Sequence, residues 1–434
     1  MIALPNNSGV NKLLSLFTNN KAKIINYSTQ IIMKGLALVL GLIPQRFINN
    51  ENIPTTDRVG IELVLTINAI LFSFIDIGIT NILYKSYTIE TDKTKIAKIW
   101  TFAFIARIVM YFVGLLILFI LYSFDWFKLG NINQLIIFGI YTSQYLLIFD
   151  SNYKSIADTK NTTFKFTLSD LITKILIATF LIILPLISKD YLNIRTYIIV
   201  NIFMYILTNV VDYNFQKEFI SWSFPNLEIF KTNYKTILTL MFTGLISTLY
   251  AKVPIYFVEQ GKDIISFGIA SKTFDLLLII PSLIIPIVSS DFVKKIKDAD
   301  SATNKELLLK KHLLFSFVIG VFCFVLCILL SYPILYLTNS LRFENAVQYT
   351  LLFSINFLFQ PVLYFIGSTN FLFSLNKFLI LNITILFIIA IPIYYLAYNY
   401  FGVVGLISSL TIINIIDLIL KLSYLKHKKN SLYA

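Results

Sequence analysis

Apolar residues occur in long runs along this chain, with short polar segments between them. Such runs lie at 24–44, 60–84, 97–122, 133–150, 165–188, 195–213, 236–258, 264–290, 311–331, 346–367, 378–398 and 402–424. A helix needs about 20 apolar residues to cross a hydrocarbon core of about 30 Å, because its backbone polar groups must be bonded within the lipid. The pattern therefore predicts an all-α polytopic membrane protein with about 12 transmembrane helices.

The second half of the chain repeats the pattern of the first. A shift of about 208 residues places Arg58-Val59-Gly60-Ile61 on Ser266-Phe267-Gly268-Ile269, and each segment opens a span that ends in a basic joint. Because six spans return the chain to its starting side, we expect parallel repeats that form two six-helix lobes around a central cleft. The predicted boundaries are an N-terminal segment 1–23, an N-lobe 24–213, a linker 214–235, a C-lobe 236–424 and a basic tail 425–434.

The net charge of +13 follows the same alternation. Of the 36 lysines and arginines, 24 lie on one set of alternate joints, 7 on the opposite set and 5 within the predicted spans. The positive-inside rule then places both termini in the cytoplasm. The excess is explained by topology and by contact with the anionic headgroups of membrane lipids, so no nucleic acid partner is expected.

Other features argue against an enzyme. Cys323 and Cys327 lie four residues apart within one span, which is typical of packing on a helix face. With two histidines in the chain, no histidine metal site is expected. No phosphate-binding GxxxxGK[ST] loop is present, and no joint is long enough for the extracytoplasmic domain expected of a lipid-linked sugar polymerase or ligase. We therefore expect a non-enzyme without a cofactor, whose first apolar run is a retained span.

Several short segments resemble a known transporter superfamily. In chain order they are Arg58-Val59-Gly60, Phe74-Ile75-Asp76-Ile77-Gly78, Gly268-Ile269-Ala270-Ser271-Lys272, the set Pro281, Pro286 and Ser289, and Tyr400-Phe401-Gly402-Val403-Val404-Gly405. Their order and positions on the twelve-span frame resemble the multidrug/oligosaccharidyl-lipid/polysaccharide exporter superfamily over nearly the whole chain. Within it, the resemblance is to Wzx-type flippases of O-antigen, polysaccharide and lipid-linked oligosaccharide precursors.

This resemblance implies a flippase that moves undecaprenyl-pyrophosphate-linked oligosaccharide repeat units, of the O-antigen or capsule type, from the cytoplasmic to the periplasmic leaflet by alternating access. It also implies a bacterial inner membrane, a role in lipopolysaccharide or capsule biosynthesis, and the polysaccharide polymerase machinery as a partner. A multidrug/cation antiporter of the same superfamily is the leading alternative. A lipid-linked sugar polymerase or ligase and a non-transporting scaffold are alternatives from other classes.

The charges within the spans point to an anionic cargo. A cation near the bilayer centre costs about 2.5 to 3.5 kcal/mol on insertion scales, so it usually faces a wet cavity or a partner. The basic residues at such positions are Lys34, Arg107, Lys174, Lys252 and Lys272. Our hypothesis is that Lys34, Arg107 and Lys272, with Lys174, bind the pyrophosphate and acidic sugars of the cargo.

Structural pairing is the alternative for some of these cations. Asp170 precedes Lys174 by four residues, and Asp275 follows Lys272 by three, so each pair shares a helix face. A second use of the acidic residues is energy coupling, since a carboxylate partly removed from water can bind and release a proton. Within the set Glu62, Asp76, Asp275 and Asp417, we select Asp76 and Asp275 as the ion-coupling candidates.

Overall fold

The computed structural model describes residues 21–427, except for 76–78, 91, 127–128, 130–131, 161, 225–237, 239–240, 243, 247, 259–261, 298–300 and 373–375. Over this part of the chain the regular structure is helical and contains no β-strand. The predicted all-α fold is therefore confirmed.

The helices of the first half follow the predicted spans closely. They are α2 (Lys21–Ile48), α3 (Thr55–Ile75), α4 (Ile79–Ile89), α5 (Lys93–Ser123), α6 (Gln134–Thr159), α7 (Thr163–Ile187) and α8 (Ile194–Gln216), with the short turns η2 (Lys189–Tyr191) and η3 (Lys217–Phe219). Together, α3 and α4 cover the second predicted span. These helices form the N-lobe.

The second half forms the C-lobe. It contains short helical stretches between 238 and 252, followed by η4 (Val253–Tyr256), α10 (Lys262–Leu277), α11 (Ile279–Lys297), α12 (Ala302–Leu337), α13 (Ala346–Ser354), η5 (Ile355–Leu358), α14 (Gln360–Leu372) and α15 (Asn376–His427). Equivalent helices of the two halves begin at nearly constant separation: α3 and α10 begin 207 residues apart, and α5 and α12 begin 209 apart. The repeat inferred from the sequence is thus present in the helix order.

The long helix α15 is two helices in one. Ile380–Tyr424 has 45 residues of membrane-compatible composition, whereas about 20 residues suffice for one crossing. At Gly402 the backbone leaves the helical region, with φ 59° and ψ −148°. A side chain would strain this conformation, so glycine allows the chain to fold back there. The turn separates the last two predicted spans, 378–398 and 402–424.

Length and composition alone identify fewer spans. By these measures, six helices within the described residues could cross a membrane, and the pair Ala346–Leu358 and Gln360–Gly367, bent by 42°, could form a seventh. Because α15 is long enough to cross the membrane twice, it accounts for one more span. The remaining predicted spans correspond to α2, to α3 with α4, to α6, and to the segment that ends at η4. These are broken or carry polar residues, such as Asp150 and Asn152 of α6, that are buried within the protein.

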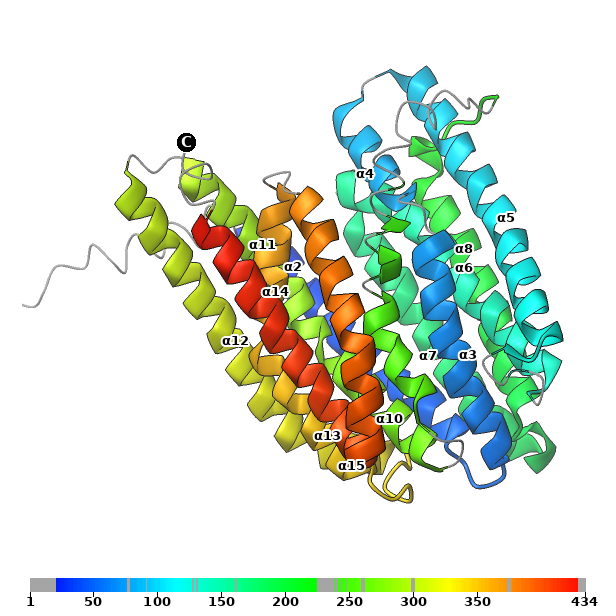
Figure 1. The fold of residues 1–434 in the computed structure, drawn as a ribbon. Helices are drawn as coiled ribbons and strands as arrows, with labels where there is room; N and C mark the ends of the chain where they lie inside the picture. The colour runs from blue at the N-terminus through cyan, green and yellow to red at the C-terminus, as the bar shows by residue number, and fades with distance from the viewer. Residues whose placement is uncertain are drawn as a thin grey trace, which may run out of the picture.

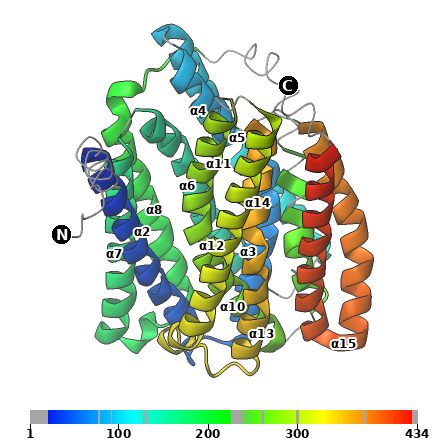
Figure 2. The ribbon, with the colours of Figure 1, turned by 90° about the vertical axis from the view of Figure 1, so that its left-hand side faces the viewer.

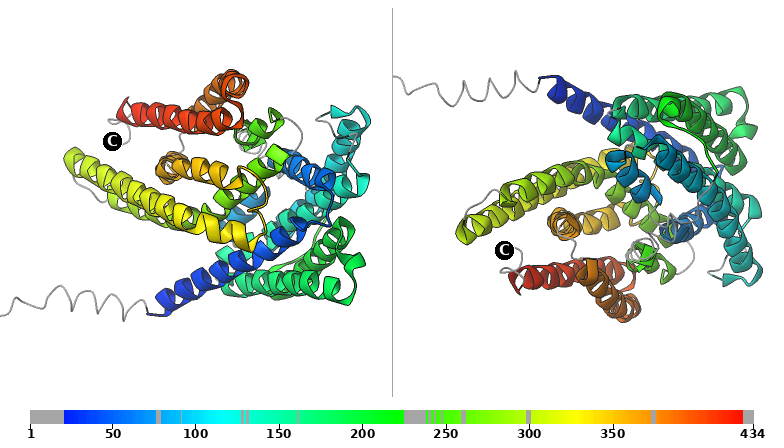
Figure 3. Two further views of the ribbon diagram at one scale, coloured as in Figure 1. Left: turned by 90° about the horizontal axis from the view of Figure 1, so that it is seen from below. Right: turned by 90° about the horizontal axis from the view of Figure 1, so that it is seen from above.

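The lobes stand next to each other, with their helices running between two ends (Figures 1 and 3). The start of α2 and the end of α15 lie at one end, together with the C-terminal ends of α4, α6 and α11 (Figure 2). The joints 49–54 and 338–345 lie at the other end. With the positive-inside rule, this arrangement is the one expected if the first end faces the cytoplasm.

Side-chain burial agrees with a lipid environment. The outer faces of α5 and α12 expose large apolar residues, among them Val109, Phe112, Leu116, Leu314 and Phe322. Polar residues instead turn toward helix neighbours, where their hydrogen bonds can be completed. The polar positions that remain inside the lobes therefore contain the candidates for function.

Candidate functional site

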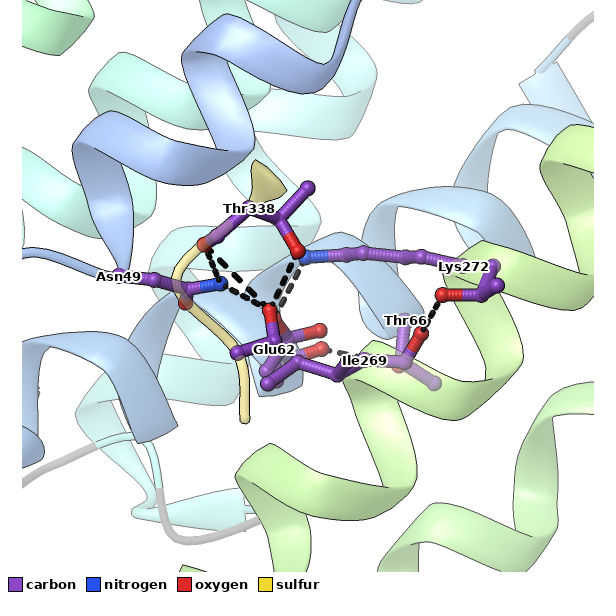
Figure 4. A network of polar contacts seen from close by, with 8 residues as sticks. Asn49, Glu62, Thr66, Ile269, Lys272 and Thr338 are labelled. Atoms are coloured by element: carbon purple, nitrogen blue, oxygen red, sulfur yellow. Dashed lines mark hydrogen bonds and ion pairs between the residues drawn. The ribbon is translucent and has the colours of Figure 1, made fainter. Parts of the chain in front are cut away.

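The two lobes touch at the end of the molecule opposite the termini. The joint 49–54 faces the joint 338–345, and the first half of α3 packs against α10 (Figure 4). We call this contact region the inter-lobe seam. Its residues are Asn49, Glu51, Arg58, Val59 and Glu62 of the N-lobe, and Gly268, Lys272, Thr338, Asn339, Ser340, Arg342 and Phe343 of the C-lobe.

A buried ion pair crosses the seam. The Nζ atom of Lys272 on α10 lies 2.5 Å from Oε1 of Glu62 on α3. The side chain of Glu62 is 7% exposed and that of Lys272 is 28% exposed. Breaking such a pair without solvating the carboxylate leaves a buried, uncompensated charge, which typically costs about 3–5 kcal/mol. The pair therefore stabilises contact between the lobes for as long as the seam excludes water.

The absence of a side chain at Gly268 makes room for this carboxylate. A Cβ atom at Gly268 would lie 2.5 Å from Oε2 and 2.6 Å from Cδ of Glu62. Real Cβ atoms do not come so close to other heavy atoms, so any substitution would displace Glu62. Gly268 belongs to the Gly268-Ile269-Ala270-Ser271-Lys272 segment that carried part of the sequence resemblance, and the structure gives that glycine a physical role.

A second polar contact joins the two joints. Nδ2 of Asn49 donates to Oγ of Ser340 at 2.8 Å and to the carbonyl oxygen of Thr338 at 3.2 Å. In return, Nδ2 of Asn339 donates to the carbonyl oxygen of Asn49 at 3.2 Å. Asn49 is almost fully buried, so these bonds replace water that it has lost. Figure 4 shows Asn49 and Glu62 directed toward Thr338 and Lys272.

At the edge of the seam, two arginines pack against the ring of Phe343. The guanidinium of Arg58 donates to backbone oxygens of Asn50 and Ile53 and lies 5.4 Å from the centre of the Phe343 ring. Burial lowers the pKa of Arg58 to about 10, so it stays protonated at neutral pH. The guanidinium of Arg342 also lies over the Phe343 ring, 4.9 Å from its centre, and one of its nitrogens lies 3.8 Å from the exposed carboxylate of Glu51. The pair of Arg342 with Glu51 is open to water and hence weak.

Of the predicted cargo-binding residues, Lys272 lies in the seam. Its predicted partner was wrong: Lys272 binds Glu62, while Asp275 binds Lys252 at 3.0 Å. Asp275 lies on the more exposed side of α10, and Glu62 offers Lys272 a buried partner from another helix. Sequence spacing along one helix could not reveal that competition.

Arg107 lies inside the N-lobe instead of in the seam. It is fully buried, and its guanidinium donates to Oγ1 of Thr80 at 2.9 Å, Oδ1 of Asn152 at 3.2 Å and Oγ of Ser151 at 3.3 Å. The hydroxyl of Tyr145 donates to its backbone oxygen at 2.5 Å. These bonds connect α4, α5 and α6, so in this conformation Arg107 stabilises the lobe.

The other predicted residues have separate positions. Lys174 on α7 pairs with Asp170 at 3.0 Å, as the pairing alternative expected, and both side chains are about one-third exposed. Lys34 falls within α2, but its side chain lies outside the described part of the structure, and Asp76 lies outside the described residues altogether. The structure thus brings one of the predicted cations, Lys272, to the contact between the lobes.

Sequence analysis missed two buried carboxyl groups of the N-lobe, whereas Asp417 of the C-lobe was among the acidic residues considered for energy coupling. The two missed groups are those of Asp150 on α6 and Asp212 on α8, whose side chains are both buried within the lobe. In the C-lobe, Asp417 accepts hydrogen bonds from Asn382 at 2.6 Å and from Lys421 at 2.7 Å, and all three are buried. Asp150 and Asp212 lie at the ends of their apolar runs, where a carboxylate is usually solvated, so the sequence alone gave little reason to select them.

No known family model matches the sequence, and no curated protein is similar to it at a significant level. Solved structures do match the fold. The chain is similar to an inward-facing multidrug resistance MATE transporter of the MOP superfamily (TM-score 0.74, 10% identity, 94% of this chain and 98% of that chain). It is also similar to the outward-facing form of a MATE transporter of that superfamily (TM-score 0.64, 12% identity, 94% and 96%).

A third similar structure is the lipid II flippase MurJ in an inward closed conformation (TM-score 0.66, 15% identity, 92% of this chain and 87% of that chain). In each comparison the match extends over nearly the whole of both chains, although few residues are identical. The chain therefore has the two-lobed fold of about twelve transmembrane helices found in these transporters.

Proposed function

We propose that this protein is a flippase that moves undecaprenyl-pyrophosphate-linked oligosaccharide repeat units, of the O-antigen or capsule type, from the cytoplasmic to the periplasmic leaflet of a bacterial inner membrane. The headgroup of the cargo passes between the lobes while the polyprenyl chain stays in the lipid. The lobes are 24–213 and 236–424, and the polysaccharide polymerase machinery accepts the product.

The observation that carries the proposal is the seam. The Glu62–Lys272 pair and the hydrogen bonds of Asn49 hold the lobes together at one end, which supports a state that is closed on that side. If the basic end is cytoplasmic, this is an inward-facing arrangement. The higher TM-score against the inward-facing transporter than against the outward-facing one, 0.74 and 0.64, supports the same assignment. Alternating access requires the seam to part and the opposite end to close.

The sign of the intramembrane charges supports an anionic cargo. Lys272 lies between the lobes and is partly exposed, and Lys34 falls in the middle of the first span. A pyrophosphate carries closely spaced negative oxygens, and ammonium groups bind such oxygens through charge-assisted hydrogen bonds. The similarity to a lipid II flippase supports a lipid-linked cargo.

Deletion of the gene in its native strain tests the proposal. We expect loss of surface glycan and accumulation of complete lipid-linked repeat units on the cytoplasmic leaflet. Complementation with the Lys34→Ala variant at normal expression should fail to restore export. If glycan synthesis is normal in the deletion strain, the flippase assignment is wrong.

A multidrug/cation antiporter is the second candidate. The buried carboxyls Asp150 and Asp212 in the N-lobe favour it, because a cationic drug or a coupling ion needs an acidic site. The similar MATE structures support it as well. An antiporter predicts that the deletion strain becomes sensitive to cationic drugs while its surface glycan stays normal.

Energy coupling can be tested with purified protein in liposomes. If Asp76 or Asp275 couples transport to an ion, flipping should slow when the ion gradient is removed, and Asp76→Asn or Asp275→Asn should remove that dependence. Equal rates with and without a gradient would exclude obligatory coupling.

A further inference from the structure

We propose that Glu62 determines which lipids this protein accepts, because it competes with the cargo for Lys272. A ligand must bind Lys272 more strongly than one carboxylate does before it can be carried. We infer that a pyrophosphate-linked lipid meets this threshold and that a lipid linked through a single phosphate diester does not. This inference rests on the proposed function and names the headgroup chemistry that the protein selects.

The two members of the pair differ in how easily a ligand can reach them. Lys272 retains 28% of its side-chain exposure, whereas Glu62 retains 7%. Glu62 lies between α3 and α10, against the bare backbone of Gly268. An incoming anion therefore meets the ammonium group first, and Glu62 is the occupant that it must displace.

The charge of the ligand sets the result of this competition. A phosphate diester carries one negative charge, as Glu62 does, so the exchange gains little and leaves a buried carboxylate without its partner. A pyrophosphate diester carries two charges on adjacent groups and offers more acceptor oxygens to the three N–H donors of the lysine. The second phosphate supplies the interaction that outweighs the loss of Glu62.

Displacement also biases the conformation of the seam. With Lys272 bound to cargo, Glu62 would be charged and buried between α3 and α10 as long as the seam is closed. Parting of the seam gives Glu62 access to water on the outer side and removes that penalty. The cargo therefore favours the open seam, because it binds that state with a better overall free energy. After the cargo leaves, Lys272 and Glu62 can pair again and close the seam.

Full-length protein in liposomes can test this competition with two synthetic lipids that carry one sugar chain through a polyprenyl pyrophosphate or a polyprenyl phosphate. At moderate lipid concentration, we expect wild-type protein to bind and flip the pyrophosphate lipid but not the phosphate lipid. The Glu62→Gln variant should bind both lipids about fivefold more tightly or better, a factor within the usual range of coupling between sites, and should begin to flip the phosphate lipid. Unchanged affinities in Glu62→Gln would overturn the inference.

A second readout follows the seam directly. A cysteine at Val59, which packs in the seam, should react faster with a membrane-impermeant thiol reagent from the outside when the pyrophosphate lipid is added to otherwise wild-type protein. In the Glu62→Gln background the reaction should be fast without lipid and should not respond to it. A response to the lipid that is equal in both backgrounds would also contradict the inference.

Two variants make the result specific. Glu306→Gln removes a carboxylate from an exposed ion pair with Lys310 on α12, outside the seam, and should behave as wild type. Glu62→Asp keeps the charge and should retain selection against the phosphate lipid, which tests the idea even if Glu62→Gln folds poorly. If wild-type protein binds neither lipid, the proposed function fails, whereas binding of the pyrophosphate lipid with no effect of Glu62 removes this inference alone.

Discussion

Arg107 and Lys272 are both cations within predicted membrane spans, yet they are held in different ways. Arg107 is completely buried and bonded to three side chains of its own lobe. Lys272 is partly exposed and bonded to a carboxylate of the other lobe. The first arrangement stabilises one lobe, and the second joins two lobes that separate in the proposed alternating-access cycle. The position of a cation within its predicted span does not by itself distinguish these roles.

The largest expected effect is on the N-lobe. Arg107→Ala removes the guanidinium from Thr80, Ser151 and Asn152 and leaves buried polar groups and a cavity, so we expect a loss of about 3 kcal/mol or more. Thermal unfolding of purified protein measures it. Arg107→Lys keeps the charge but not the planar fork, and should be intermediate. Full stability of Arg107→Ala would return Arg107 to the group of cargo-binding candidates.

Replacement of Lys272 should separate transport from stability. Lys272→Gln leaves Glu62 without a cation and removes the proposed cargo contact, so flipping should fall to background while thermal stability falls less than in Arg107→Ala. Flipping assays and thermal unfolding on one preparation provide both values. Transport at the wild-type rate would show that Lys272 is purely structural.

Gly268→Ala should weaken the seam without changing any charge. Its new methyl group would push against the carboxylate of Glu62, and we expect the cysteine at Val59 to react several-fold faster from the outside. The native Cys323 and Cys327 are buried and should contribute little background. Gly41→Ala is a suitable control, because nothing lies within 4 Å of a Cβ atom at that glycine.

Asn49→Ala should have a smaller effect on the same region. It removes the side-chain bonds to Thr338 and Ser340 and leaves partly unsatisfied groups, with a cost of about 1–2 kcal/mol. Faster labelling at Val59 and a modest fall in thermal stability are the expected results. If labelling does not change, the asparagine serves the local joint and not the contact between lobes.

The smallest effect is expected at Lys174. Both side chains of its pair with Asp170 are about one-third exposed, and the two residues lie four apart on one helix. Such pairs contribute at most about 0.5 kcal/mol. Lys174→Gln should therefore leave stability nearly unchanged, and flipping at the wild-type rate is expected if the pair is structural. A strong transport defect with normal stability would instead support the predicted contact with cargo.

Much of the fold was predictable because membrane spans have a length and composition fixed by the bilayer. The repeat was predictable too, from the glycine-containing segments at 58–61 and 266–269. The break within α15 was also predictable, because it coincides with the boundary between two apolar runs of the sequence. The division of single predicted spans into α3 and α4, or α13 and α14, was not predicted, because local breaks depend on how helices pack.

The site was less accessible to sequence reasoning. Lys272 could be selected because a cation in a span is rare, but its partner lies 210 residues away on another lobe. The nearer Asp275 was the natural choice by helix spacing and was wrong. Asp150 and Asp212 were missed because each ends an apolar run, and their burial is created by neighbouring helices. Pairings that depend on tertiary contact cannot be read from spacing along one helix.

Contact at one end of two long lobes also has a mechanical consequence. For as long as the seam stays closed, it is the pivot about which the lobes can rotate, and helices about 30 Å long extend from it. A rotation of about 10° at the seam would move the far ends by about 5 Å, since the displacement grows with helix length. Small rearrangements around Glu62 and Asn49 are thereby magnified at the basic end. Substitutions of these two buried seam residues should change how often the lobes move relative to each other, while the length of the helices determines how far their far ends travel.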